Sequence, residues 1–87
     1  MTHLLLIYDI PNDRIRTKVA TACEDYGLDR VQLSAFYGRL NRNLQEELML
    51  KIETLLGDES GKVQLIPVAH NEWNRRLVIE QMPDDPS

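Results

Sequence analysis

The polar residue with the clearest chemical potential is Asp9, which directly follows an apolar run and precedes Ile10 and Pro11. A carboxylate at the end of a buried strand is well placed to bind a divalent cation; the alternative interpretation is a helix cap or a turn residue. Mg²⁺ prefers six oxygen ligands and usually takes one or two carboxylates, together with water and substrate phosphate. One Asp9 per chain is too few, so a metal site here predicts a twofold dimer that brings two copies of Asp9 together.

Basic side chains form a second group, because they can contact the phosphates of nucleic acid. Arg14 and Lys18 share one face of a predicted helix, whereas Arg16 lies on another side of it. Further arginines flank the next strand region or lie near the end of the sequence: Arg30, Arg39, Arg42, Arg75 and Arg76. Each alone is typical of a solvated surface. Together they can line one surface of a dimer.

The other reactive residue types do not form a pattern that indicates catalysis. Ser34 has no histidine placed in the sequence to suggest a proton relay. The single cysteine, Cys23, lies on the apolar face of a predicted helix, where a buried and inert thiol is expected. One cysteine also excludes an intrachain disulfide and a CxxC zinc site. Trp73 is a candidate anchor for a subunit or partner contact.

Length and composition indicate one small globular domain. The chain has 87 residues, of which 43% are hydrophobic and 28% charged. We expect the domain to span residues 1–81 and residues 82–87 to form a flexible acidic tail. The formal net charge of −4 argues against a protein that binds polyanions by charge alone. Neither a membrane span nor a signal peptide is visible, so a cytoplasmic location is expected.

The charge is unevenly distributed along the chain. Residues 1–43 hold six basic and five acidic residues, whereas residues 44–87 hold four basic and nine acidic ones. The candidate phosphate-binding arginines therefore gather in the first half. The second half is acidic, which suits a solvated surface and contact with a protein partner.

Hydrophobic periodicity predicts the elements that must position these side chains. The apolar run 3–8 is a strand that ends at Asp9, and a helix capped by Asn12 or Asp13 ends at Gly27. Residues 31–40 form one bent strand or a short pair, with a bulge or bend at Gly38. A second helix follows, with Asn43 and Glu46 as its cap. Three segments complete the prediction: a strand over 62–68, a turn over 70–74 and a last strand over 76–81.

This order predicts an α+β fold. Two helices on one face of a mostly antiparallel sheet make a two-layer sandwich, and the ferredoxin-like arrangement is the leading candidate. The other face of the sheet needs a cover. Because residues 4–7 are apolar at every position, both faces of that strand are expected to be buried. A second copy of the chain can supply the cover.

The motifs resemble one known family. Tyr8-Asp9-Ile10 ends the first strand, Tyr26-Gly27-Leu28 follows the first helix, and residues 30–40 read RVQLSAFYGRL. The two more specific motifs, YDI and RVQxSxFxG, occur together at a spacing that is similar to the small CRISPR-associated adaptation proteins, the Cas-two family. Ile66-Pro67 also resembles the family. The resemblance covers about residues 3–80 in length and element order.

The resemblance implies a ferredoxin-like fold and a symmetric homodimer whose last strand pairs across the dimer. It implies a role in CRISPR spacer acquisition, as a scaffold beside the CRISPR integrase with double-stranded protospacer DNA across the assembly. Some members are described as metal-dependent endonucleases on single-stranded RNA or double-stranded DNA. By position, Asp9 is then the catalytic residue that binds Mg²⁺. The implied nucleic-acid contacts are Arg14, Arg16, Arg30 and Arg39.

Two features depart from the family pattern. Tyr37 follows the motif residue Phe36, where members often carry an acidic residue, and the net charge of −4 is low for a protein that holds DNA. Both favour the scaffold role over autonomous nuclease activity. A toxin-like ribonuclease and a small ferredoxin-like regulatory protein are the alternatives, since the fold alone does not distinguish them.

Overall fold

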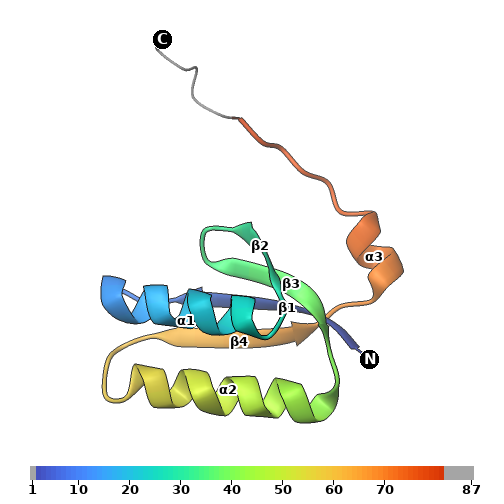
Figure 1. Ribbon diagram of the computed structural model, residues 1–87. Helices are drawn as coiled ribbons and strands as arrows, with labels where there is room; N and C mark the ends of the chain where they lie inside the picture. The colour runs from blue at the N-terminus through green and yellow to red at the C-terminus, as the bar shows by residue number, and fades with distance from the viewer. Residues whose placement is uncertain (1, 82–87) are drawn as a thin grey trace.

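Two helices pack on one face of a four-stranded antiparallel sheet in the computed structural model, which describes residues 2–81 (Figure 1). The strand order is β2-β3-β1-β4, so the first strand lies inside the sheet and β2 and β4 form its edges. The predicted ferredoxin-like α+β arrangement is confirmed. The elements in chain order are β1 (Thr2–Asp9), α1 (Asp13–Asp25), β2 (Asp29–Gln32), β3 (Ala35–Leu40), α2 (Arg42–Leu56), β4 (Lys62–Pro67) and α3 (His70–Asn74).

Local signals set the ends of α1 as predicted. The side-chain oxygen of Asn12 accepts a hydrogen bond of 3.0 Å from the backbone N–H of Ile15, which satisfies one of the free donors at the helix start. After the helix, Gly27 adopts a φ of +84°, a left-handed conformation that suits glycine. The strand β1 is thereby joined to α1 by a loop of only three residues.

The predicted cap of the second helix is wrong by two positions. Asn41 caps α2, because its side-chain oxygen accepts a hydrogen bond of 2.8 Å from the backbone N–H of Leu44. The backbone of Asn41 is extended and the helix begins at Arg42, so Asn43 already lies in the first helical turn. The helix ends at Gly57, as expected.

Residues 29–40 form a short pair of strands, one of the two predicted alternatives. A two-residue turn, Leu33-Ser34, joins β2 and β3, so Ser34 is not a strand residue. The register shift lies between Arg30 and Gln32 and not at Gly38. Gly38 instead allows close packing, because a Cβ there would lie 2.6 Å from the Leu28 Cδ2 atom.

The hydrophobic core lies between the sheet and the two helices. Inward-facing residues of β1 alternate with outward-facing ones, and the core gathers large side chains from both layers: Leu4, Leu6, Ile10, Val19, Phe36, Leu48 and Ile52. On the other side of β1, Leu5 and Ile7 are only half-buried. The expectation that both faces are buried is therefore not met within one chain. We call this side of the sheet, which α1 and α2 do not cover and which includes Leu5, Ile7 and Ile66, the open face.

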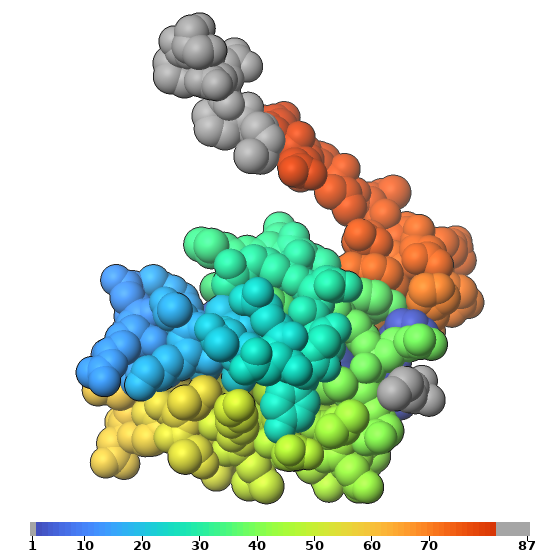
Figure 2. Space-filling model, viewed as in Figure 1, coloured from blue at the N-terminus to red at the C-terminus, as the bar shows by residue number. Residues whose placement is uncertain are grey.

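Two predictions for the C-terminal part are wrong for the single chain. Residues 70–74 form the short helix α3 and not a turn, and residues 76–81 form no strand because they pair with no other strand. We call residues 76–81 the C-terminal arm. It extends away from the sheet and helices (Figures 1 and 2), and Leu77 and Ile79 are 98% and 89% exposed. The predicted acidic tail 82–87 lies outside the described residues. No helix within residues 2–81 is long and apolar enough to span a bilayer.

Candidate metal site and nucleic-acid interface

Asp9 is the last residue of β1 and is exposed. Its neighbour across the sheet is Lys62 of β4, and both residues line a small hollow of about 120 Å³. Side chains alternate along a strand, so Asp9 lies on the same side as Leu5 and Ile7. Asn12 caps α1, which removes the helix-cap interpretation of Asp9. The carboxylate therefore sits at one end of the open face.

A single chain does not supply a Mg²⁺ site at this position. Within residues 2–81, no three histidine, cysteine, aspartate or glutamate side chains come together in a way that could hold a metal ion. One exposed carboxylate beside a lysine provides too few oxygen ligands for an octahedral ion. The donor set of one chain does not fit the metal, and a second Asp9 carboxylate is the missing component.

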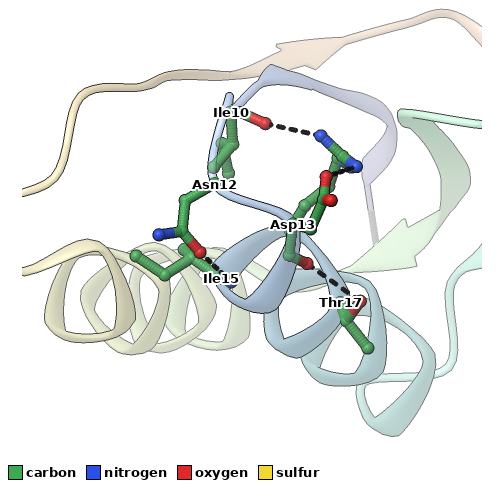
Figure 3. Close-up of polar contacts among 6 residues, drawn as sticks. Ile10, Asn12, Asp13, Ile15 and Thr17 are labelled. Atoms are coloured by element: carbon green, nitrogen blue, oxygen red, sulfur yellow. Dashed lines mark hydrogen bonds and ion pairs between the residues drawn. The ribbon is translucent and has the colours of Figure 1, made fainter.

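Arg16 holds the loop that follows Asp9. Its guanidinium donates a hydrogen bond of 3.0 Å to the carbonyl oxygen of Ile10 and another to the carboxylate of Asp13, the partners labelled in Figure 3. Its side chain is 37% exposed. The structure thus gives this predicted phosphate contact a role within the chain, because two of its five donors fix the β1–α1 loop.

The other three predicted arginines are exposed, but they lie in different places. Arg14 is in the first turn of α1, near Asp9 in the chain, and takes part in none of the ion pairs found among residues 2–81. Arg30 is on the edge strand β2 and lies over the Phe36 ring, 5.2 Å from its centroid. Arg39 of β3 pairs with His3 at the far end of β1. A strand rise of about 3.3 Å per residue separates Asp9 from that end by about 20 Å.

Two buried side chains carry perturbed pKa values for simple physical reasons. Burial raises the pKa of the Cys23 thiol to about 12, so the inert thiol predicted from the sequence is confirmed as a buried one. Burial also raises the pKa of the Tyr8 phenol, although the nearby Arg30 acts in the opposite direction. Neither group is ionised near neutral pH, so neither is a candidate nucleophile.

Sequence reasoning missed a cluster of stacked side chains at the Arg39 end of the sheet. The rings of Tyr37 and Trp73 are parallel within 5°, with centroids 3.9 Å apart. The Arg76 guanidinium lies 3.9 Å from the centroid of the Trp73 ring. His3 and His70 stack with centroids 4.4 Å apart. Trp73 was recognised as a possible anchor, but its partners are distant in the sequence and gave no signal.

His3 illustrates the electrostatics of this cluster. Its ring is partly desolvated, and His70 from α3 and Arg39 from β3 add repulsion toward a positive charge. All three effects lower the pKa of His3 below its usual value. The neutral imidazole is therefore the form that fits the stack.

Comparison with known proteins gives the family. The sequence pattern of the family described as CRISPR associated protein Cas2 matches residues 1–76. A CRISPR-associated endoribonuclease Cas2 from Chloroflexus aurantiacus is 47% identical over 81 residues, which cover 93% of this chain and 95% of the relative. A Cas1/Cas2 endonuclease fusion from Thermoproteus tenax is 30% identical over 93% of this chain and 31% of the fusion.

A solved structure supports the fold independently. The crystal structure of Streptococcus pyogenes Cas2 superposes with a TM-score of 0.78 at 19% identity, covering 90% of this chain and 99% of that one. At this level of identity the likeness shows the fold alone. The motif, the relatives and the sheet order agree with one another, and the chain belongs to the CRISPR-associated Cas2 family.

Proposed function

We propose that this protein is a homodimeric scaffold for CRISPR spacer acquisition, which acts in the cytoplasm beside the CRISPR integrase and holds double-stranded DNA. The observation that carries the proposal is the open face, an apolar sheet surface that α1 and α2 leave uncovered and that α3 covers only at its Tyr37 end. The fusion of a Cas1 and a Cas2 endonuclease in the Thermoproteus tenax relative supports the integrase as the partner. The functional unit is the domain over residues 1–81.

A second copy of the chain is the cover that this face fits best. Leu5 and Ile7 lie at its centre, and a groove of about 480 Å³ runs between them and the C-terminal arm. Two such faces pack against each other in a twofold dimer, which removes the apolar surface from water. Asp9 lies on the same side of β1, so the same packing brings two Asp9 carboxylates toward one axis.

The C-terminal arm is the second element that a dimer completes. β4 is an edge strand, and an apolar groove of about 390 Å³ runs beside it, with Met49, Ile52 and Val63 among its lining residues. In an extended arm, Leu77 and Ile79 point to the same side. We propose that the arm pairs with the β4 edge of the other copy as a fifth strand and places these two side chains in the groove.

The dimer binds DNA through phosphate contacts. Arg14, Arg30 and Arg39 are exposed, and a dimer presents each of them twice. Arginines that contact phosphates position a duplex without reading its sequence, which suits a scaffold for variable protospacers. Arg16 contributes through its unpaired donors while it holds the loop next to Asp9.

Nuclease activity is the second and more specific part of the proposal. The Chloroflexus aurantiacus relative is named an endoribonuclease, and its identity to this chain extends over nearly the full length of both. Two Asp9 carboxylates in a dimer would hold Mg²⁺, which supplies charge neutralisation at a phosphate and a more acidic bound water. The substrate is then a phosphodiester of single-stranded RNA or double-stranded DNA.

The test begins with the quaternary structure. Sedimentation velocity of the wild type and of Ile7→Glu measures whether the open face is the interface; Leu33→Glu is the matched control, since Leu33 is 78% exposed in the β2–β3 turn. We expect a wild-type dimer, a monomeric Ile7→Glu variant and a dimeric control. A wild type that stays monomeric at high concentration contradicts the proposal.

The second stage tests the partner and the chemistry. The wild-type dimer is mixed with the integrase encoded beside the same CRISPR array and with duplex DNA, and a ternary complex is expected. Cleavage of RNA and DNA is then compared for the wild type and Asp9→Asn, with Mg²⁺ and with chelator. Loss of metal-dependent cleavage in Asp9→Asn supports the nuclease; a folded dimer that cuts nothing leaves the scaffold role alone.

A further inference from the structure

Three side chains form a continuous stack that joins the sheet to the C-terminal arm. Tyr37 belongs to β3, Trp73 to α3, and Arg76 is the first residue of the arm. One face of the Trp73 indole lies 3.9 Å from the Tyr37 ring, and the Arg76 guanidinium lies 3.9 Å from the Trp73 centroid. Arginine and aromatic rings stack favourably because the cation interacts with the π-electrons.

The helix α3 depends on this stack for its position. It has only five residues, it buries none of them, and no side chain caps its N-terminus. A helix of this length is not stable alone, because nucleation costs more than one turn of hydrogen bonds returns. The contacts that hold it against the sheet include Trp73 on Tyr37 and His70 on His3, and the Tyr37 hydroxyl also lies 3.5 Å from the His70 Nδ1 atom, at the long limit of a hydrogen bond.

The same stack fixes the direction in which the arm leaves the domain. The Arg76 backbone N–H donates a hydrogen bond of 3.1 Å to the Trp73 carbonyl oxygen, and its guanidinium donates a second one of 3.0 Å to the same atom. Both the backbone and the side chain of the first arm residue are therefore attached to Trp73. Beyond Arg76, Leu77 and Ile79 make little contact with their own chain.

We infer that Tyr37, Trp73 and Arg76 are positioning residues that pre-orient the C-terminal arm for its place on a second copy of the chain. The inference rests on the proposed dimer and names the residues that make the arm ready to bind. A segment that is already directed toward its site loses less conformational entropy on association, so the dimer is tighter.

The experiment measures the dimer dissociation constant by sedimentation equilibrium for pairs of matched variants. Tyr37→Phe keeps the ring and Tyr37→Leu removes it; Trp73→Phe and Trp73→Leu form a second pair, and Arg76→Leu removes the stacking cation. We expect the three leucine variants to dissociate roughly tenfold more readily, the scale of one ordered residue, and the two phenylalanine variants to stay near the wild type. Far-ultraviolet circular dichroism and thermal unfolding check that the protomer fold is kept.

A second measurement uses the wild type alone. Trp73 is the only tryptophan, so its fluorescence reports directly on the stack. We expect a tryptophan that acrylamide quenches poorly in the monomer as well as in the dimer, because the stack precedes association. Quenching that is free in the monomer and falls only on dimer formation overturns the inference. Leucine variants that dimerise as tightly as the wild type also overturn the inference. A monomeric wild type overturns the proposed dimer and this inference together.

Discussion

The two faces of the sheet differ sharply in how complete they are. On the helix-covered face, α1 and α2 bury Leu4, Leu6 and Phe36 fully. The side chains that cap the two helices accept hydrogen bonds from backbone N–H groups in their first turns. On the open face, Leu5 and Ile7 of the same strand stay half-buried, and the arm pairs with no strand within residues 2–81. The helix-covered face holds the fold of one chain together, whereas the open face is the surface that we propose a second copy of the chain covers. Substitutions on the two faces should therefore affect different measurements.

The largest effect is expected in the core of the helix-covered face. Phe36 is fully buried and stacks with Tyr8 at a centroid distance of 6.3 Å. Phe36→Ala should lower the free energy of unfolding by about 3–5 kcal/mol, because it removes apolar burial and leaves a cavity. Urea denaturation monitored by circular dichroism measures it. Leu33→Ala at the exposed turn is the control and should change little; equal losses for both variants would contradict the comparison.

The next largest effect concerns Gly38, where β3 approaches the start of β2. A Cβ added there would lie 2.6 Å from the side chain of Leu28, which is itself buried. Gly38→Ala should cost about 1–3 kcal/mol of unfolding free energy through overpacking. Thermal unfolding of Gly38→Ala, Leu28→Ala and the double variant completes a mutant cycle, because Leu28→Ala alone also costs stability by removing a buried side chain. Gly38→Ala should cost less in the Leu28→Ala background than in the wild type, and an equal cost in both would show that Leu28 is not the obstacle.

A smaller and more selective effect separates Arg14 from Arg16. Arg16→Gln should lower stability by about 1 kcal/mol, since it removes hydrogen bonds that fix the β1–α1 loop. Arg14→Gln should leave stability unchanged and weaken DNA binding. The slope of log K against log salt should fall by roughly one per phosphate contact that is lost. Unfolding curves and DNA titrations at several salt concentrations measure both effects, and a stability loss in Arg14→Gln would refute this division.

The smallest effect is a pH dependence at the Arg39 end of the sheet, where His3 lies. The pKa of His3 is lowered in the folded protein, so the unfolded chain binds a proton more readily. The contribution of neutral His3 to the free energy of unfolding is therefore fully present above the unfolded pKa of about 6.5. It is lost as the pH drops through that value toward the lower folded pKa. Urea midpoints between neutral and mildly acidic pH should show this decline. His3→Gln should weaken it, whereas a wild-type midpoint that rises on acidification contradicts the assigned direction.

Much of the fold was predictable because its signals are local. Asn12 and Gly27 bracket α1 by side-chain capping and a left-handed φ, which are properties of single residues. Asn41 was missed in favour of Asn43 because both fit a cap by composition, and only the backbone distinguishes them. The arm has strand-forming residues but pairs with no strand in the described part of the chain, and pairing depends on tertiary or quaternary structure.

The candidate site also combines residues that the sequence indicated with contacts that only the structure shows. Asp9 and Arg14 could be proposed from the sequence because Asp9 follows an apolar strand and Arg14 lies on the helix that comes next, and their roles stay predictions. The intrachain bonds of Arg16 and the stack of Tyr37 on Trp73 were not found. The stack joins residues more than thirty positions apart, and no periodicity reports such a contact. Residue type indicated Trp73 as an anchor, but only the fold shows what it contacts.

The most direct test of the central claim asks whether two Asp9 residues meet when the open face is covered. Asp9→Cys is treated with a short bis-maleimide linker; the native Cys23 is buried and should not react, and Leu33→Cys at the exposed turn is the control. We expect rapid covalent dimer formation for Asp9→Cys, little for the control, and none for Asp9→Cys combined with Ile7→Glu. A non-covalent dimer in which Asp9→Cys fails to cross-link would contradict the account.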